Sequence, residues 1–259
     1  MRILSIDSSL GTQVAVVETA GGHDATLGGC SLRVLSRAEQ TDTRRHAESL
    51  GQMLSEALST PDMVDHRLDA VIAATGPAPF TGLRAGLVTA RVVGRARGVP
   101  VHGVSSLDAV ARLALDELGT RSGERDPVVL VATDARRREV YTALFRAAGP
   151  DDVTRLTAIS VCPPAQVAEQ ITGPVGEIGT VDVVAGSGAA LHPELVDSVQ
   201  PAASREVLAP VSGDVLTQVR IALCRLDRGE ALSTEPLYLR HADVQMPTAR
   251  KRVLTSDPG

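Results

Sequence analysis

A strand that ends in an aspartate and leads through a short turn into a second strand occurs twice in this chain. The first copy ends its leading strand at Asp7 and the second at Asp134. The strands of the two copies are predicted at residues 2–7, 12–18, 127–134 and 139–145. The two aspartates are separated by about half of the chain, so the pattern predicts an internal duplication. Two unrelated hairpins would give the same pattern by chance.

The rest of the chain alternates between strand and helix patterns. Short apolar runs predict further strands at residues 30–37, 69–74, 101–104 and 181–185. Apolar residues at helical spacing predict helices at residues 43–58, 83–97, 105–118, 163–171 and 212–228. In the last helix Ser212 is expected at the N-cap and Gly229 just past the end, and Asp108 is expected to complete a capping box with Ser105. Such alternation favours an α/β fold.

Residues 76–86 form a loop rich in glycine and proline between a predicted strand and a predicted helix. α/β proteins use a strand, a glycine-rich turn and a helix N-terminus in this order to place backbone N–H groups beside a phosphate or a partner. Its two prolines make the loop stiff, and Thr81 is expected to cap the helix. Gly82 and Gly86 leave one helical face bare, so another backbone can come close. A tight turn without any ligand would have the same sequence.

Composition excludes several classes of protein. A net charge of −5, no tryptophan, two tyrosines and two phenylalanines argue against a dedicated nucleic-acid surface. Three widely spaced cysteines without a CxxC fit a reducing cytoplasm. The N-terminal residues lack the apolar core of a signal peptide, and no stretch approaches the ~20 apolar residues of a membrane span. Because Lys251 is the only lysine and lies near the C-terminus, no Walker or Schiff-base lysine is expected in the fold.

Catalytic groups are hard to find in the sequence. No two histidines are three or four residues apart, so the helical metal pair of a metalloenzyme is missing and no catalytic metal is expected. The serine of Gly186-Ser187-Gly188 lacks the glycine two positions earlier that a nucleophile elbow requires. Asp7 and Asp134 could each position Mg²⁺ at a strand end, or simply cap turns, and we favour the second interpretation.

The duplication, the strand ending in Asp7 and the glycine–proline loop together resemble the TsaB (YeaZ) family. The residues that carry the resemblance are Ile6-Asp7-Ser8-Ser9, Arg45 to Leu50, Gly76 to Arg84 and Glu235 to Arg240. The family loop usually has Gly-Ser where this chain has Ala78-Pro79, which puts any anion contact made there in doubt. The resemblance covers residues 1 to about 110 well and the second half weakly.

The resemblance implies an actin-like ATPase (ASKHA) fold of two duplicated ribonuclease-H-like halves. Its expected domains are residues 1–104, completed by a C-terminal helix within 212–240, and residues 105–211, with a tail at 241–259. It implies a cytoplasmic, non-catalytic subunit that binds TsaD, with TsaE, for threonylcarbamoyl transfer to the adenosine beside the anticodon of tRNAs. It implies tRNA contact only through the complex and no tightly bound cofactor. ATP or ADP is expected at the subunit boundary, where Asp7, Thr81 and Arg84 would be the residues nearest to it.

The partner surface is expected on the helices at 43–58 and 83–97. The apolar arc of the first helix is wider than one sheet contact requires, so Leu50 or Met53 is expected to face a partner. The full predicted interface is Ala47, Leu50, Met53, Leu54, Gly82, Leu83, Gly86 and Leu87. The same helices could instead join two copies of the chain. An actin-like small-molecule kinase and a glycoprotease-type peptidase are the alternative functions.

Overall fold

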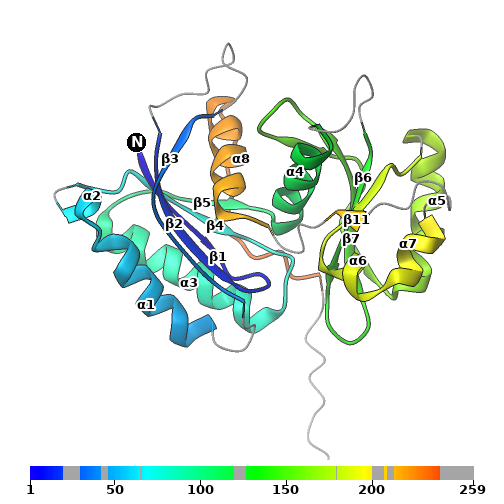
Figure 1. The fold of residues 1–259 in the computed structure, drawn as a ribbon, viewed down its shortest axis with the longest axis horizontal. Coiled ribbons are helices and arrows are strands. Elements are labelled where there is room, and N and C mark those ends of the chain that lie inside the picture. Colours follow the sequence, from blue (N-terminus) through cyan, green and yellow to red (C-terminus); the bar gives the residue numbers. More distant parts are fainter. Residues whose placement is uncertain are drawn as a thin grey trace, which may run out of the picture.

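The computed structural model describes residues 1–19, 30–41, 46–64, 66–119, 127–178, 180–199, 207–208 and 213–239. These residues form two β-sheets with helices on both faces of each (Figure 1). From one side of the molecule to the other, the layers are a helix pair, the first sheet, two central helices, the second sheet and a group of short helices (Figure 1). The predicted α/β class is confirmed.

The first sheet has the strand order β3-β2-β1-β4-β5. Its strands are β1 (Arg2–Asp7), β2 (Thr12–Thr19), β3 (Leu32–Gln40), β4 (Ala70–Ala74) and β5 (Val101–Val104). β1 pairs antiparallel with β2 and parallel with β4. Helices cover both faces of the sheet, so β1 and β4 are buried on both faces and read as continuous apolar runs.

The second sheet repeats this order as β8-β7-β6-β10-β11, with β9 also pairing β7. Its strands are β6 (Val129–Asp134), β7 (Val140–Ala147), β8 (Val153–Arg155), β9 (Ser160–Cys162), β10 (Val183–Ala185) and β11 (Val207–Leu208). The two turns match in detail, because Asp7 Oδ1 accepts a hydrogen bond from the N–H of Ser9 and Asp134 Oδ1 accepts one from that of Arg136, both at 2.7 Å. The predicted duplication is therefore confirmed.

Helices from different parts of the chain cover the four sheet faces. They are α1 (His46–Leu58), α2 (Pro61–Val64), α3 (Phe80–Arg97), α4 (Ser106–Gly119), the 3₁₀ turn η1 (Pro164–Gln166), α5 (Val167–Ile178), α6 (Ser187–Leu191), α7 (Pro193–Val199) and α8 (Val215–Asp227). α1 and α3 pack on the outer face of the first sheet, and α8 packs on its inner face. α4 packs on the inner face of the second sheet, and α5 to α7 on its outer face. The predicted domain boundaries remain a prediction.

Three predicted helix caps are wrong. α3 begins at Phe80 with Pro79 as its N-cap, so Thr81 lies inside the first turn. α8 is capped by Asp214, whose carboxylate accepts from the N–H of Thr217, and Ser212 lies outside the described residues. Asp108 pairs with arginines instead of capping α4. Ion pairing and proline geometry override the local capping signals here.

The last described segment, residues 230–239, crosses the first half like a strap. The N–H of Gly103 donates to the carbonyl of Leu232 at the β5 edge, and the N–H of Leu237 donates to the carbonyl of Thr75. A Cβ on Gly103 would lie 2.1 Å from the carbonyl oxygen of Ser233. Glycine is therefore required for the strap to lie this close to β5.

Candidate functional site

The glycine–proline loop lies at the junction between the two halves. Pro77, Ala78 and Pro79 line a void there, facing Thr133, Asp134 and Ser187 of the second half. The void measures about 10 Å³, which is about the space of one water molecule. The described side chains thus fill the junction at this point. Beside it, an open cavity of about 380 Å³ lies between the two halves. It is lined by Leu10, Gly11, Gln13, Glu39, Gln40 and Thr41 of the first half and by Asp134, Arg136, Ser187, Ala190 and Leu191 of the second.

Asp7 lies at this junction and is 3% exposed. Its Oδ1 accepts from the N–H of Ser9 at 2.7 Å, and its Oδ2 accepts from Nε2 of Gln218 in α8 at 2.5 Å. Burial raises the pKa of Asp7 and the nearby carboxylate of Asp214 adds to the increase, against the lowering effect of these hydrogen bonds. The aspartate therefore holds a turn and joins β1 to α8, which agrees with the interpretation favoured from the sequence.

Asp134 has the equivalent place in the second half. Its carboxylate caps the β6–β7 turn and pairs with Arg136 at 3.1 Å, while its N–H donates to Oγ of Ser187. The glycines on either side of Ser187 are required for packing, since a Cβ on Gly186 or Gly188 would lie within 2.9 Å of the carbonyl oxygen of Ala132. Gly186-Ser187-Gly188 thus brings α6 against β6.

The side chain of Ser8 lies against Gly82 and Gly86 of α3. The hydroxyl of Ser8 donates to the carbonyl of Gly82 at 2.7 Å and accepts from the N–H of Gly86 at 3.0 Å. A Cβ on Gly86 would lie 2.3 Å from this hydroxyl oxygen. The sequence predicted that another backbone would come close at this face of α3, and within the chain the group that lies against it is the side chain of Ser8 in the β1–β2 turn.

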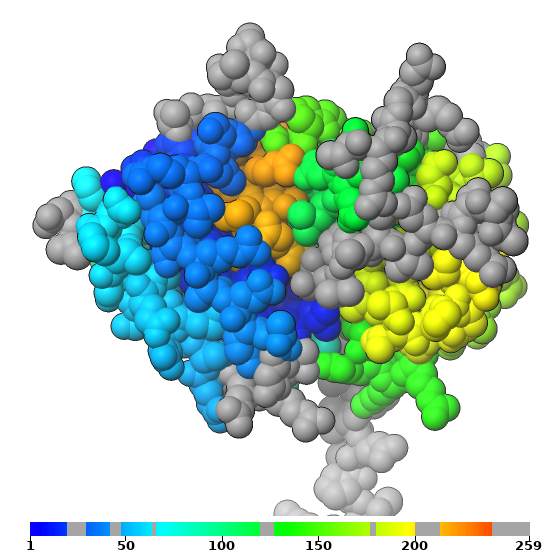
Figure 2. All heavy atoms as spheres, viewed as in Figure 1, coloured from blue at the N-terminus to red at the C-terminus, as the bar shows by residue number. Residues whose placement is uncertain are grey.

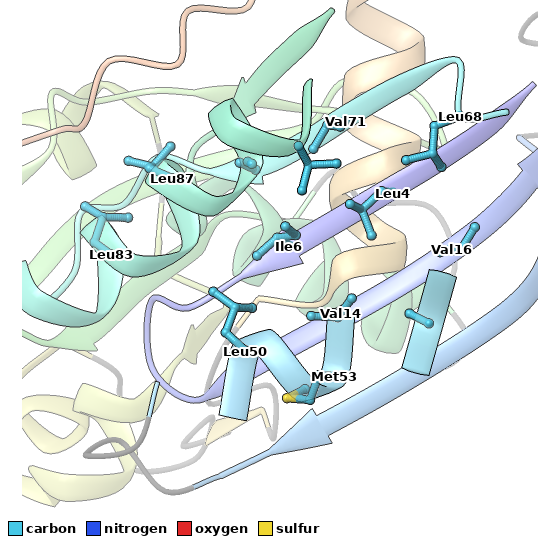
Figure 3. Packing of buried hydrophobic residues seen from close by; sticks show 14 of the residues in the cluster. Leu4, Ile6, Val14, Val16, Leu50, Met53, Leu68, Val71, Leu83 and Leu87 are labelled. Carbon is cyan, nitrogen blue, oxygen red and sulfur yellow. The ribbon is translucent and has the colours of Figure 1, made fainter. Parts of the chain in front are cut away.

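Four of the predicted interface residues belong to the hydrophobic core of the first half (Figure 3). Leu50 and Met53 of α1 are 2% and 7% exposed, and Leu83 and Leu87 of α3 are 0% and 4% exposed. The expectation that Leu50 or Met53 faces outward is therefore wrong. The wide apolar arc of α1 is explained by its position between β2 and α3, because it packs against both.

The other predicted interface residues have mixed positions. Leu54 is half-buried against the same core, and the side chain of Ala47 lies outside the described residues. Gly82 and Gly86 are buried. Thr81 and Arg84 are exposed on α3, away from the buried Asp7, so the three residues expected near a nucleotide do not form one site.

The exposed face of α3 carries an apolar stripe that the sequence did not reveal. Phe80, Val88 and Val92 are 51%, 57% and 60% exposed. Beside the stripe, α1 and α3 border an open groove of about 440 Å³. Its lining residues are Leu50, Gly51, Thr81, Arg84, Ala85, Val88 and Thr89. The spacing of four residues between Val88 and Val92 could have indicated this stripe, but Gly82 and Gly86 led to a prediction on the opposite face of α3.

Two of the chain's few aromatic residues, Phe80 and Tyr238, lie together at one end of the apolar stripe. The rings of Phe80 and Tyr238 lie 5.2 Å apart, and the guanidinium of Arg84 lies 3.7 Å from the centroid of Phe80. Nε of Arg84 donates to the hydroxyl of Tyr238 at 2.7 Å. The strap is thereby fixed to the first turn of α3, and it extends the apolar surface of the helix.

No group of three or more histidine, cysteine, aspartate or glutamate side chains that could hold a metal ion occurs among the described residues. Within the same residues, no helix is long and apolar enough to cross a membrane.

Comparison with known proteins places these features in a family. The sequence model described as TsaD, tRNA N6-adenosine threonylcarbamoyltransferase, matches residues 33–177. An uncharacterized protein of Mycobacterium leprae is 36% identical over 186 residues, which cover 71% of this chain and 43% of that protein. The tRNA N6-adenosine threonylcarbamoyltransferase of Rhizobium johnstonii is 32% identical over 123 residues, covering 44% of this chain and 34% of that enzyme. The chain therefore spans less than half the length of either relative.

The solved structure of YeaZ from Pseudomonas aeruginosa superposes with a TM-score of 0.66 over 92% of this chain and 99% of that one, at 23% identity. This likeness confirms the fold that the sequence resemblance predicted. The match of the family model extends over more than half of the chain and across both sheets. The chain belongs to the tRNA N6-adenosine threonylcarbamoyltransferase (TsaD) family and has the fold of YeaZ.

Proposed function

We propose that this protein is a non-catalytic subunit that binds TsaD, with TsaE, in the cytoplasmic assembly that transfers threonylcarbamoyl to the adenosine beside the anticodon of tRNAs. Membership of the TsaD family supports a role in this modification. The chain reaches tRNA through the complex. The activating mechanism is population shift, in which binding energy is available only when the partner adopts its competent conformation.

The apolar stripe of α3 is the observation that carries this proposal. Phe80, Val88 and Val92 are more than half exposed on one helical face, beside an open groove. Exposed apolar surface of this kind, next to a groove, is typical of a protein–protein contact. A few such side chains at the centre of an interface can dominate affinity. TsaD is the proposed occupant, and a second copy of the chain would compete for the same face.

The filled space at the glycine–proline loop favours a partner subunit over an actin-like kinase. A glycine-rich loop that binds phosphate needs free space at its backbone, whereas Pro77, Ala78 and Pro79 leave about 10 Å³ there. None of these three residues lines the larger cavity of about 380 Å³ between the halves. We place any ATP or ADP at the boundary with another subunit. Purified alone, the chain should show no ATPase, kinase or peptidase activity above background.

Substitution of the stripe tests the proposal. Val92→Arg should leave the melting temperature within about 2 °C of wild type and raise the Kd for TsaD at least about 10-fold, because one interface valine contributes ~1.5–3 kcal/mol. Leu191→Arg on α6 is the matched control, since Leu191 is also 60% exposed but belongs to the second half. Both proteins would be measured by calorimetry with TsaD and in a tRNA modification assay.

Two outcomes would refute the proposal. One is a Val92→Arg protein that binds TsaD and supports modification as well as the Leu191→Arg protein does. The other is ATP turnover by the purified chain that survives repurification and disappears in Asp7→Ala, which would restore the kinase alternative.

A further inference from the structure

We infer that α8 acts as a clamp that fastens the second half of the molecule to the first and fixes the arrangement of the two halves. Its arginines Arg220, Arg225 and Arg228 project from a helix that packs on the first sheet and bind carboxylates of the second half. The molecule is therefore one rigid body, not a pair of halves that open and close. This inference does not depend on which partner the protein binds.

Arg220 makes the widest set of contacts. Its guanidinium donates to Oδ2 of Asp116 in α4 at 2.6 Å, to Oδ1 of Asp151 at 2.7 Å and to the carbonyl of Pro150 at 2.7 Å. Burial alone would lower the pKa of Arg220, but its bonds to Asp116 and Asp151 hold that pKa above the ordinary value. The backbone of the first half binds Asp151 as well, because the N–H of Cys30 donates to Oδ2 at 2.6 Å.

Arg225 and Arg228 add a second set of contacts, one to two turns further along the helix. Arg225 binds Oδ2 of Asp108 at 2.9 Å and Oδ1 of Asp152 at 2.8 Å, and Arg228 binds the other oxygen of Asp152. α8 thus contacts both α4 and the β7–β8 turn. In Figure 2 α8, in orange, lies between the first half, in blue, and α4, in green.

Three of the four acids of the clamp are buried, whereas the side chain of Asp116 is 34% exposed. Asp108 is 3% exposed, and Asp151 and Asp152 are each 1% exposed. Removing one member of a buried ion pair leaves an uncompensated charge and is strongly destabilising. Separating the halves would break all of these ion pairs together. These buried pairs therefore oppose a hinge opening far more strongly than the same number of exposed ion pairs would.

The clamp is also connected to the filled junction at the glycine–proline loop. Gln218, two residues before Arg220 on α8, donates to Asp7 at the edge of the junction. On the other side, the N–H of Ser106 at the start of α4 donates to the carbonyl of Gly76 in the glycine–proline loop. The junction and the clamp are therefore formed by the same two helices, and one cannot open without the other.

A distance measurement tests the clamp directly. Spin labels would be placed at Ser55→Cys on α1 and Ala165→Cys in η1, both exposed, in a chain whose native cysteines are replaced. Double electron–electron resonance on the labelled protein with its clamp arginines intact should give one narrow distance distribution, which ATP and Mg²⁺ should leave unchanged. The variant Arg220→Gln/Arg225→Gln/Arg228→Gln should give a broad or longer distribution while circular dichroism still shows folded sheets. The control Arg67→Gln/Arg95→Gln/Arg97→Gln removes the same charge from exposed positions of the first half and should leave the distance unchanged.

Amide exchange of the unsubstituted protein provides a second measurement in case the clamp variant does not fold. The amides of Ser106 and Thr75 at the junction should exchange as slowly as those of the central strand β1, because they open only with global unfolding. In a folded clamp variant they should exchange at least about 100-fold faster. Junction amides that open well before β1 in the unsubstituted protein, or a folded clamp variant with an unchanged distance, would overturn the inference.

Discussion

Replacing Gly86 by alanine should destabilise the protein, although alanine is the better helix former. The new Cβ would lie 2.3 Å from Oγ of Ser8, so the hydroxyl must move. It then loses its bonds to the carbonyl of Gly82 and the N–H of Gly86. Two buried hydrogen bonds contribute about 1 kcal/mol each, and a stranded polar group costs about 1–3 kcal/mol. Alanine returns about 1 kcal/mol of helix propensity. The expected net loss is therefore at least about 2 kcal/mol.

Thermal unfolding followed by circular dichroism measures this effect. For a chain of this size a loss of 2 kcal/mol lowers the melting temperature by about 4–8 °C. Gly51→Ala is the matched control, because Gly51 lies in α1 and its Cβ would have nothing within 4 Å. That substitution should raise stability by about 0.5–1 kcal/mol.

The double variant Ser8→Ala/Gly86→Ala separates the clash from other effects. Without the hydroxyl the closest remaining contact is Cβ to Cβ at 3.1 Å, so the double variant should lose about 1 kcal/mol less than the sum of the single variants. The reasoning fails if Gly86→Ala melts at or above the wild-type temperature, or if the two substitutions are additive. Either result would mean that the Ser8 hydroxyl does not occupy the bare face of α3.

Three further substitutions have defined outcomes. Leu50→Arg places a charge at a 2% exposed core position and should prevent folding or lower the melting temperature by more than about 10 °C. A folded, soluble monomer with an unchanged melting temperature would show that Leu50 is not a core residue. Gly103→Ala should displace the strap at Ser233, cost about 1–3 kcal/mol and speed amide exchange at Leu237; unchanged exchange would contradict this. Because the folded pKa of Asp7 is raised, the stability it contributes is present below its unfolded pKa, near 3.8, and is lost as the pH rises through the folded value. In urea titrations the Asp7→Asn protein should therefore have a larger free energy of unfolding than wild type at pH 7, and this difference should disappear below about pH 4. A difference that does not change with pH would contradict the raised pKa of Asp7.

The elements with strong periodicity were predictable, and the residues that cap or cover them were not. The duplicated hairpins, β4, α3 and α4 follow directly from apolar runs and helical spacing. Short pieces such as β8, β9 and α7 have too few residues for a periodic signal. Thr81 and Asp108 had good local capping chemistry, but Pro79 fixes the start of α3 and two arginines bind Asp108. Contacts distant in sequence decided both cases.

The candidate site shows a similar limit. Leu50 and Met53 were expected at an interface because the apolar arc of α1 is wide, yet a helix packed against both a sheet and a neighbouring helix needs a wide arc as well. Sequence periodicity reports the width of an apolar face, not the identity of what covers it. Val88 and Val92 were overlooked because an exposed valine and a buried valine contribute equally to hydropathy.

The two strand-to-strand turns at the junction are packed in a similar way in both halves. At the first turn, the Ser8 hydroxyl fits against Gly82 and Gly86 of α3. At the second, Gly186 and Gly188 bring α6 against the carbonyl of Ala132. In both halves the glycines beside the turn admit a neighbouring part of the protein itself. Small residues that usually signal a ligand here serve internal packing.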